Sequence, residues 1–154
     1  MTPRQYLVLS GKMGKGAAMA IKKLEALADA IGFLNDAHNP ESRAYQLRNP
    51  GLCRAYSFKQ LNAVDEDGYR IFTSLIGGYR FLVQDLQWKV SGQTRAKGES
   101  GKLKQTSTLT DLLKSFKLSS IENLMQAVAF LNTALQTEEI TATTELKYFL
   151  EEGV

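Results

Sequence analysis

The chain of 154 residues has little of the chemistry that many enzymes depend on: one cysteine, Cys53, and one histidine, His38. A single cysteine excludes a disulfide framework within the chain. The two residues together are too few for a Cys/His zinc site or for a catalytic centre that needs several histidines. We therefore expect no metal site and no cofactor.

Long apolar runs are also missing. Lys, Glu, Asp or Arg interrupts every apolar stretch well before the roughly 18 residues that a membrane-spanning helix needs. The N-terminus lacks the plan of a signal peptide. These absences predict a protein that is made in the cytoplasm and has no membrane partner.

The composition that is present is ordinary for a globular protein, with 44% hydrophobic and 23% charged residues. A chain of this length buries enough apolar surface for one domain, so we expect residues 1–154 to form a single domain. The net charge of +3 mildly favours an anionic partner such as nucleic acid, anionic lipid or bacterial wall polymer.

Residues 5–16 join the β-prone run QYLVLS to the glycine-rich run GKMGKG, an order seen in phosphate-binding loops. The spacing does not fit such a loop, because the three glycines lie too close together. Ala17 also replaces the hydroxyl residue that would hold magnesium. We interpret this segment as a flexible, basic lead-in to a helix.

Two helices are predicted next. Apolar residues at three- and four-residue steps indicate an amphipathic helix over 17–37. Asn39 then suits a helix N-cap, and the following proline and Glu41 suit the first turn of a short helix over 40–48. The run 49-NPG-51 forces that helix to end, because a residue before proline avoids the helical region.

A change of pattern follows. Residues 52–73 are rich in aromatic and branched side chains, and 65-DEDG-68 is a turn signal between them, which predicts a small β-hairpin. Ser74 suits the N-cap of a long helix to about residue 90. The glycines at 77 and 78 indicate close backbone packing or the approach of a substrate.

Residues 91–107 lack apolar periodicity and are rich in Lys and Arg, so we expect a mobile basic loop, either a solvated connection or a contact with a polyanion. Capping boxes at Thr108 and Ser119 predict helices to Phe116 and to about residue 135, and a last helix is expected over 144–151. The expected apolar stripe of the second of these helices is Ile121, Leu124, Val128, Leu131 and Leu135. The expected fold class is mainly α, or α+β, with one small hairpin.

Glu41 is the leading candidate for a catalytic residue. Glycan hydrolysis needs a carboxylic acid that protonates the leaving oxygen, often with a second carboxylate across the sugar ring. Glu41 lies between a long helix and the Asn-Pro-Gly turn, beside a hairpin that could form one wall of a cleft. The alternative is that Glu41 only stabilises the first turn of its helix. Asp65, Glu66 and Asp67 are possible second carboxylates.

The run 49-NPGLCR-54, followed by 72-FTS-74, Gly78 and 108-TLTDLLKSF-116, resembles phage virion-associated proteins with an Asn-Pro-Gly-Asn-Ile-Arg motif. It is similar, more remotely, to the glucosaminidase branch of the lysozyme-like superfamily. The resemblance covers roughly residues 41–120 in short pieces. It implies a lysozyme-like helical domain that binds bacterial peptidoglycan and acts either as a glycan hydrolase or in a structural role.

The resemblance carries over to individual residues. Asn49 and Arg54 match the two ends of the motif and Ser74 matches the segment that opens the helix, so we expect these residues, with the aromatic Tyr56, to bind substrate. The family's catalytic glutamate precedes the motif asparagine by about a dozen residues, whereas Glu41 precedes Asn49 by eight. Asp36 or Asn39 lies nearer to that place.

A rival hypothesis makes the protein a noncatalytic nucleic-acid-binding or virion structural module. Its phosphate contacts would come from the basic segments, through Lys12, Lys15, Arg95, Lys97, Lys102 and Lys104. Phosphate binding weakens steeply with salt, whereas stacking on sugars does not. A helical interaction protein without a polymer ligand is a third alternative. Under the first two hypotheses the protein is synthesised in the cytoplasm, and virion association is expected.

Overall fold

The computed structural model describes residues 15–54, 64–91 and 103–151. These ranges are mainly helical, as the sequence predicted, and contain α2 (Lys15–Leu34), α3 (Arg43–Gln46), α4 (Leu75–Ser91), α5 (Leu109–Ser115), α6 (Ile121–Leu135) and the 3-10 helix η3 (Leu146–Leu150). None of the helices in this part of the chain has the length and apolar character needed to cross a bilayer.

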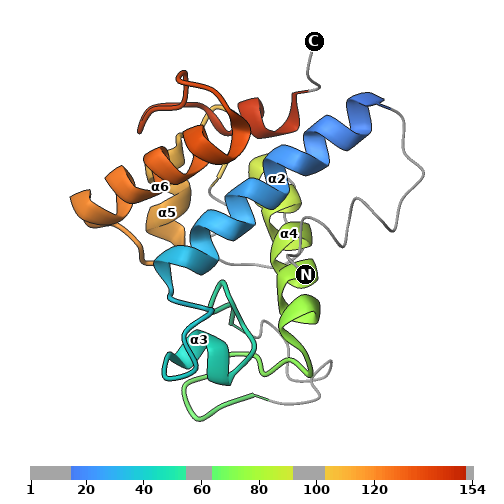
Figure 1. Cartoon of the computed structure of the whole chain (residues 1–154), viewed down its shortest axis with the longest axis vertical. Helices are drawn as coiled ribbons and strands as arrows, with labels where there is room; N and C mark the ends of the chain where they lie inside the picture. The colour runs from blue at the N-terminus through green and yellow to red at the C-terminus, as the bar shows by residue number, and fades with distance from the viewer. Residues whose placement is uncertain (1–14, 55–63, 92–102, 152–154) are drawn as a thin grey trace.

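The helix α2 lies at the centre of the packing and contacts α6, α4 and η3 (Figure 1). In Figure 1 α2 crosses α4, α5 and α6 lie together on one side, and α3 lies near the N-terminal end of α4. The largest fully buried side chains come from all of these helices except α3, and include Leu27, Ile31, Tyr79, Leu82, Leu86, Leu112, Leu131 and Phe149. The apolar periodicity therefore builds one core that joins the two halves of the chain.

The first predicted helix is confirmed, with an earlier end than expected. Asp36, with φ 58°, is left-handed and stops α2 after Leu34. The amide of Asp36 donates to the carbonyl of Phe33, and that of Ala37 to the carbonyl of Gly32, which is the bonding of a Schellman cap. No glycine marks this cap, so the sequence pattern ran on to residue 37.

The predicted start of the second helix was wrong. Ser42, not Asn39, is the N-cap of α3, and its hydroxyl accepts a hydrogen bond from the amide of Tyr45 at 3.1 Å. The side chain of Asn39 instead accepts from the amide of Glu41 at 3.0 Å and closes a turn of its own. Glu41 therefore lies before the helix, in an exposed turn.

The predicted hairpin is confirmed at its turn. The amide of Gly68, with φ 86°, donates to the carbonyl of Asp65 at 3.1 Å. In the described ranges, the pairing on either side of the turn consists of two antiparallel bridges, Arg54 with Tyr69 and Val64 with Arg70, and not of regular strands. Residues 55–63 lie outside the described ranges.

The helix α4 follows its prediction closely. The hydroxyl of Ser74 accepts from the amide of Gly77 at 3.0 Å and caps the helix. Gly78 provides the close packing that the sequence indicated, because the carbonyl of Arg48 and the ring of Pro50 lie directly against its Cα. Asp85 and Lys89, four residues apart, form an ion pair of 2.6 Å inside the core.

In the C-terminal half of the chain, α5 matches its predicted bounds, whereas α6 and η3 differ from theirs. Thr108 and Asp111 form the predicted capping box. Ser120, not Ser119, caps α6, and Ile121 is 79% exposed although the stripe placed it in the core. The last predicted helix over 144–151 is the shorter 3-10 helix η3.

Candidate functional site

The side chain of Asn49 organises the Asn-Pro-Gly turn. It is 1% exposed, and its amide nitrogen donates to the carbonyls of Cys53 and Arg70, both at 2.9 Å. Its amide oxygen accepts from the backbone N–H of Cys53, also at 2.9 Å. Both side-chain N–H groups are therefore used inside the fold. These hydrogen bonds hold residues 49–54 against residue 70, and the substrate contact of Asn49 stays a prediction.

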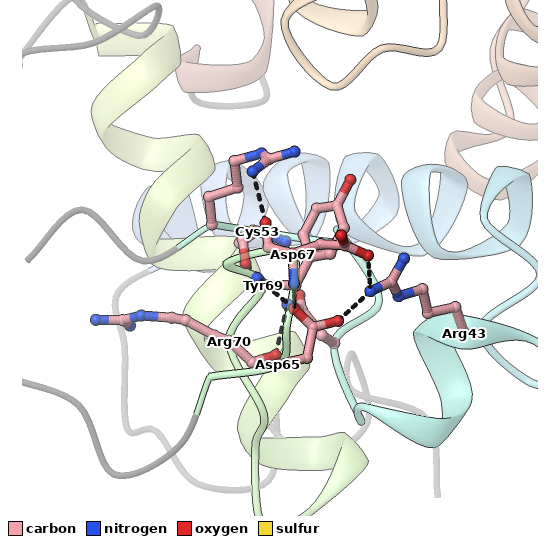
Figure 2. Close-up of polar contacts among 8 residues, drawn as sticks. Arg43, Cys53, Asp65, Asp67, Tyr69 and Arg70 are labelled. Atoms are coloured by element: carbon pink, nitrogen blue, oxygen red, sulfur yellow. Dashed lines mark hydrogen bonds and ion pairs between the residues drawn. The ribbon is translucent and has the colours of Figure 1, made fainter. Parts of the chain in front are cut away.

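The acidic turn is tied to α3 by one arginine. The guanidinium of Arg43 forms ion pairs with the carboxylates of Asp65 and Asp67, as Figure 2 shows. The hydrogen bonds that Arg43 donates to Asp67 and then to Asp65 raise the pKa of Arg43 above its ordinary value, so the guanidinium stays charged. Asp65 also accepts from the amides of Asp67 and Tyr69, at 3.0 and 2.8 Å. The carboxylates of Asp65 and Asp67 are thus occupied by structural contacts.

Tyr69 lies in contact with two guanidinium groups. The central carbons of Arg43 and Arg54 lie 4.9 and 4.6 Å from the centre of its ring. Such cation–π contacts orient a guanidinium without neutralising it. One N–H of Arg54 also donates to the carbonyl of Asp67 at 2.8 Å. Arg54 is exposed and, within residues 15–54, 64–91 and 103–151, forms no ion pair. The guanidinium of Arg54 is therefore oriented by the ring of Tyr69 and the carbonyl of Asp67 while its charge stays exposed.

Asp65 gives this turn a measurable dependence on pH. Burial acts to raise the pKa of Asp65, but hydrogen bonds from Tyr69, Arg43 and Asp67 outweigh it and hold that pKa below 3.8. A depressed carboxylate pKa contributes stability above its ordinary value, and this contribution is lost as pH falls through the folded-state value. We expect the NMR titration of the Asp65 carboxyl carbon to show a midpoint below 3.8.

The variant Arg43→Gln should raise the midpoint of Asp65 because it removes one of the groups that stabilise the carboxylate. Arg48→Gln is the matched control, since Arg48 is exposed and has no ion pair in the ranges described. A midpoint that stays in place in Arg43→Gln would show that the ion pair does not form in solution.

Glu41 is exposed, and its side chain forms no ion pair among the residues described. Asp36, the other acid near the place expected from the lysozyme-like resemblance, is also exposed and accepts a hydrogen bond from Asn39 at 2.8 Å. Neither acid lies in a buried place. Catalysis by Glu41 stays a prediction.

The other predicted site residues are dispersed. Ser74 is the exposed N-cap of α4 and its hydroxyl is used there. Lys104 is exposed, and its amide donates to the hydroxyl of Ser107 at 2.9 Å. Lys15 begins α2, and its side chain is not described. The predicted residues Tyr56, Lys12, Arg95, Lys97 and Lys102 lie outside the described residues, as does most of the predicted basic loop.

Cys53, the one cysteine of the chain, is buried. Burial raises the pKa of Cys53 to about 12, so its thiol is protonated at neutral pH and is a poor nucleophile. No group of three or more His, Cys, Asp or Glu side chains in the described segments is arranged to hold a metal ion.

Sequence reasoning missed Arg43 as a member of the site. Arg43 pairs with acids 22 and 24 residues further along the chain, and no local pattern signals such a contact. The sequence offered one signal for this contact, which is that two aspartates in the turn at 65–68, Asp65 and Asp67, favour a basic residue nearby.

Comparisons with protein-family models, with curated proteins and with solved structures find no match for this chain. The fold shown is mainly helical, and the lysozyme-like resemblance depends on the short motifs at 49–54, 72–74 and 108–116.

Proposed function

We propose that this protein is a noncatalytic wall-binding module of a phage or other mobile element, which binds peptidoglycan through the surface formed by Arg43, Arg54 and Tyr69. The observation that carries the proposal is the exposed guanidinium of Arg54, held by the ring of Tyr69 and the carbonyl of Asp67. The module has a lysozyme-like arrangement in this proposal.

A held guanidinium is suited to carboxylate ligands. Its planar set of N–H donors matches the two oxygens of a carboxylate, and a pre-oriented side chain loses little freedom on binding. Arg43 does not serve in the same way, because Asp65 and Asp67 already occupy it. The stem peptides of peptidoglycan carry carboxylates, so Arg54 is the group that we expect to recognise them.

The choice of peptidoglycan over other anions is supported by the sequence motif. Arg54 is the last residue of 49-NPGLCR-54, the run that resembles the phage virion-associated proteins. Asn49, at the start of the run, fixes the turn that presents Arg54, which explains why both ends of such a motif matter to one surface. The partly buried ring of Tyr69 adds an aromatic edge beside the cation.

Binding without cleavage follows from the positions of the acids. A general acid needs a raised pKa, which burial or a nearby like charge supplies. Glu41 and Asp36 are both exposed. In a reducing-sugar assay on purified peptidoglycan we expect no product from the wild type or from Glu41→Gln. Release of sugar by the wild type, lost in Glu41→Gln, would contradict this part of the proposal.

Arg54→Ala is expected to reduce binding to insoluble peptidoglycan by at least roughly tenfold in a co-sedimentation assay, because a charge-assisted contact contributes about 1.5 to 3 kcal/mol. Arg48→Ala is the matched control. It removes an exposed arginine of the same loop for which no ion pair is present in the ranges described, and should bind as the wild type does. Equal losses in the two variants would point to nonspecific attraction by positive charge.

The nucleic-acid hypothesis depends on the basic segments. The surplus of positive charge in the sequence falls in 1–14, 55–63 and 92–102, outside the described residues, whereas basic and acidic residues nearly balance elsewhere. Its test is the salt dependence of binding. A single guanidinium contact gives a shallow dependence, whereas several phosphate contacts give a steep one. A steep loss of binding between 50 and 200 mM salt on the scale of about a thousandfold would favour nucleic acid.

A further inference from the structure

One face of α6 carries a row of apolar side chains that the fold leaves uncovered. Ile121 is 79% exposed and Met125 is 67% exposed, and Ala129 continues the row as an exposed residue. Their four-residue spacing places them on the same side of the helix. The helix has 15 residues and only one charged residue, Glu122. In Figure 1, α6 lies at the edge of the helix packing.

We infer that a second copy of this chain covers this face, with the two α6 helices packed antiparallel about a twofold axis near Met125. This surface is separate from Arg54, and the inference does not depend on the proposed wall binding. A twofold contact uses the same patch on both copies, so the patch must complement itself. The row meets that requirement in the size of its side chains, and the charged residues that flank α6 meet it in charge.

Size complementarity comes from the order of the three side chains. In an antiparallel pair centred on Met125, the bulky Ile121 of one copy faces the small Ala129 of the other. The two Met125 side chains meet at the axis, where their flexible, unbranched chains adapt to each other. A small residue opposite a large one lets the two helices approach closely. A parallel pair would instead place Ile121 against Ile121 and Ala129 against Ala129.

Charge complementarity comes from the two ends of α6. Lys117, exposed, precedes the helix, and Glu138, exposed, follows it. The chain after the helix folds back, since the side chain of Asn132 donates to the carbonyl of Ile140 at 3.0 Å and accepts from its amide at 3.1 Å. Glu138 therefore lies beside the last turns of α6. Antiparallel packing brings it toward Lys117 of the second copy, whereas parallel packing would bring like charges together.

Cysteine cross-linking tests the inferred register. Met125→Cys should form a covalent dimer under mild oxidation, because the two positions meet at the axis and a disulfide needs Cα atoms within about 7 Å. Ile121→Cys alone should form no covalent dimer, because position 121 does not face itself in this register. A mixture of Ile121→Cys and Ala129→Cys should form one, because these two positions face each other. The wild type is the background control, since its Cys53 is buried. Efficient cross-linking of Ile121→Cys alone would overturn the antiparallel arrangement.

Sedimentation equilibrium tests the dimer itself. We expect the wild type to dimerise at micromolar concentration, and Met125→Glu to weaken the dimer at least roughly tenfold. Tyr45→Glu, a change of an exposed aromatic residue on α3, should leave it intact. Lys117→Glu and Glu138→Lys should each weaken the dimer, and the double variant should restore it. A wild type that stays monomeric, or a dimer that Met125→Glu does not weaken, would overturn the inference. The exposed face of α6 would then not be a contact between two copies of this chain.

Discussion

Replacing Gly78 with alanine is expected to reduce the free energy of unfolding by about 3 kcal/mol, because the new methyl group would overlap backbone that cannot move. A Cβ on Gly78 would lie far inside 3.0 Å of the carbonyl oxygen of Arg48 and within 2.8 Å of the ring of Pro50. Pro50 belongs to the Asn-Pro-Gly turn that Asn49 holds in place, and Arg48 directly precedes that turn. The turn and the first turn of α4 would have to separate.

Gly77→Ala is the matched control for this change. The nearest neighbour of a Cβ at Gly77 is the hydroxyl of Ser74, at 3.1 Å, which is a side-chain atom of an exposed residue and would need to move by only a few tenths of an ångström. Alanine favours a helix over glycine by about 1 kcal/mol, so this variant should be neutral or slightly more stable. Chemical denaturation followed by circular dichroism measures both. Equal stability of the two variants would contradict the close packing of α4 on the turn.

The second large effect is expected for Asn49→Ala, which should lower the free energy of unfolding by about 3 kcal/mol. The substitution removes three hydrogen bonds of 2.9 Å and leaves backbone groups of Cys53 and Arg70 without that partner in a buried place. Each buried polar group that loses its partner costs about 1 to 3 kcal/mol. The same variant should lose wall binding, because Arg54 is presented by this turn.

Asn123→Ala provides the control for loss of an asparagine. Asn123 is partly buried in the first turn of α6, and the described residues give its side chain no hydrogen bond. Its replacement should change stability by less than about 0.5 kcal/mol. Thermal denaturation of the two variants makes the comparison. If Asn49→Ala were as stable as Asn123→Ala, the hydrogen bonds of Asn49 would not stabilise the turn. A contact between Asn49 and a ligand would then be the better explanation of this residue.

The helices were largely predictable because their signals are local. A serine or threonine at the right distance before an apolar run predicted the starts of α4 and α5, and Ser74 and Thr108 make those caps. Where two residues could both cap the same helix, their spacing from the apolar run does not decide which of them does. Asn39 closes a turn and leaves the capping of α3 to Ser42, three residues later.

The site was less predictable because its contacts join residues far apart in sequence. Asn49 in a turn has the same hydrogen-bonding groups whether it binds a ligand or its own backbone, and only the fold shows that Cys53 and Arg70 use them. Ile121 fits an apolar stripe by spacing alone, but it is 79% exposed, so none of the helices in the described part of the chain covers it. Periodicity predicts which residues share a face. It does not predict how much of that face the rest of the chain covers.

The most direct test of the central claim is an NMR titration of isotope-labelled protein with a soluble peptidoglycan fragment that carries a stem-peptide carboxylate. We expect the largest shift changes at the side chain of Arg54, the ring of Tyr69 and the amides of residues 65–70, while the fragment stays uncleaved throughout. Shift changes centred on Glu41 with cleavage of the fragment, or no change near Arg54 at saturating fragment, would contradict a noncatalytic wall-binding surface at this site.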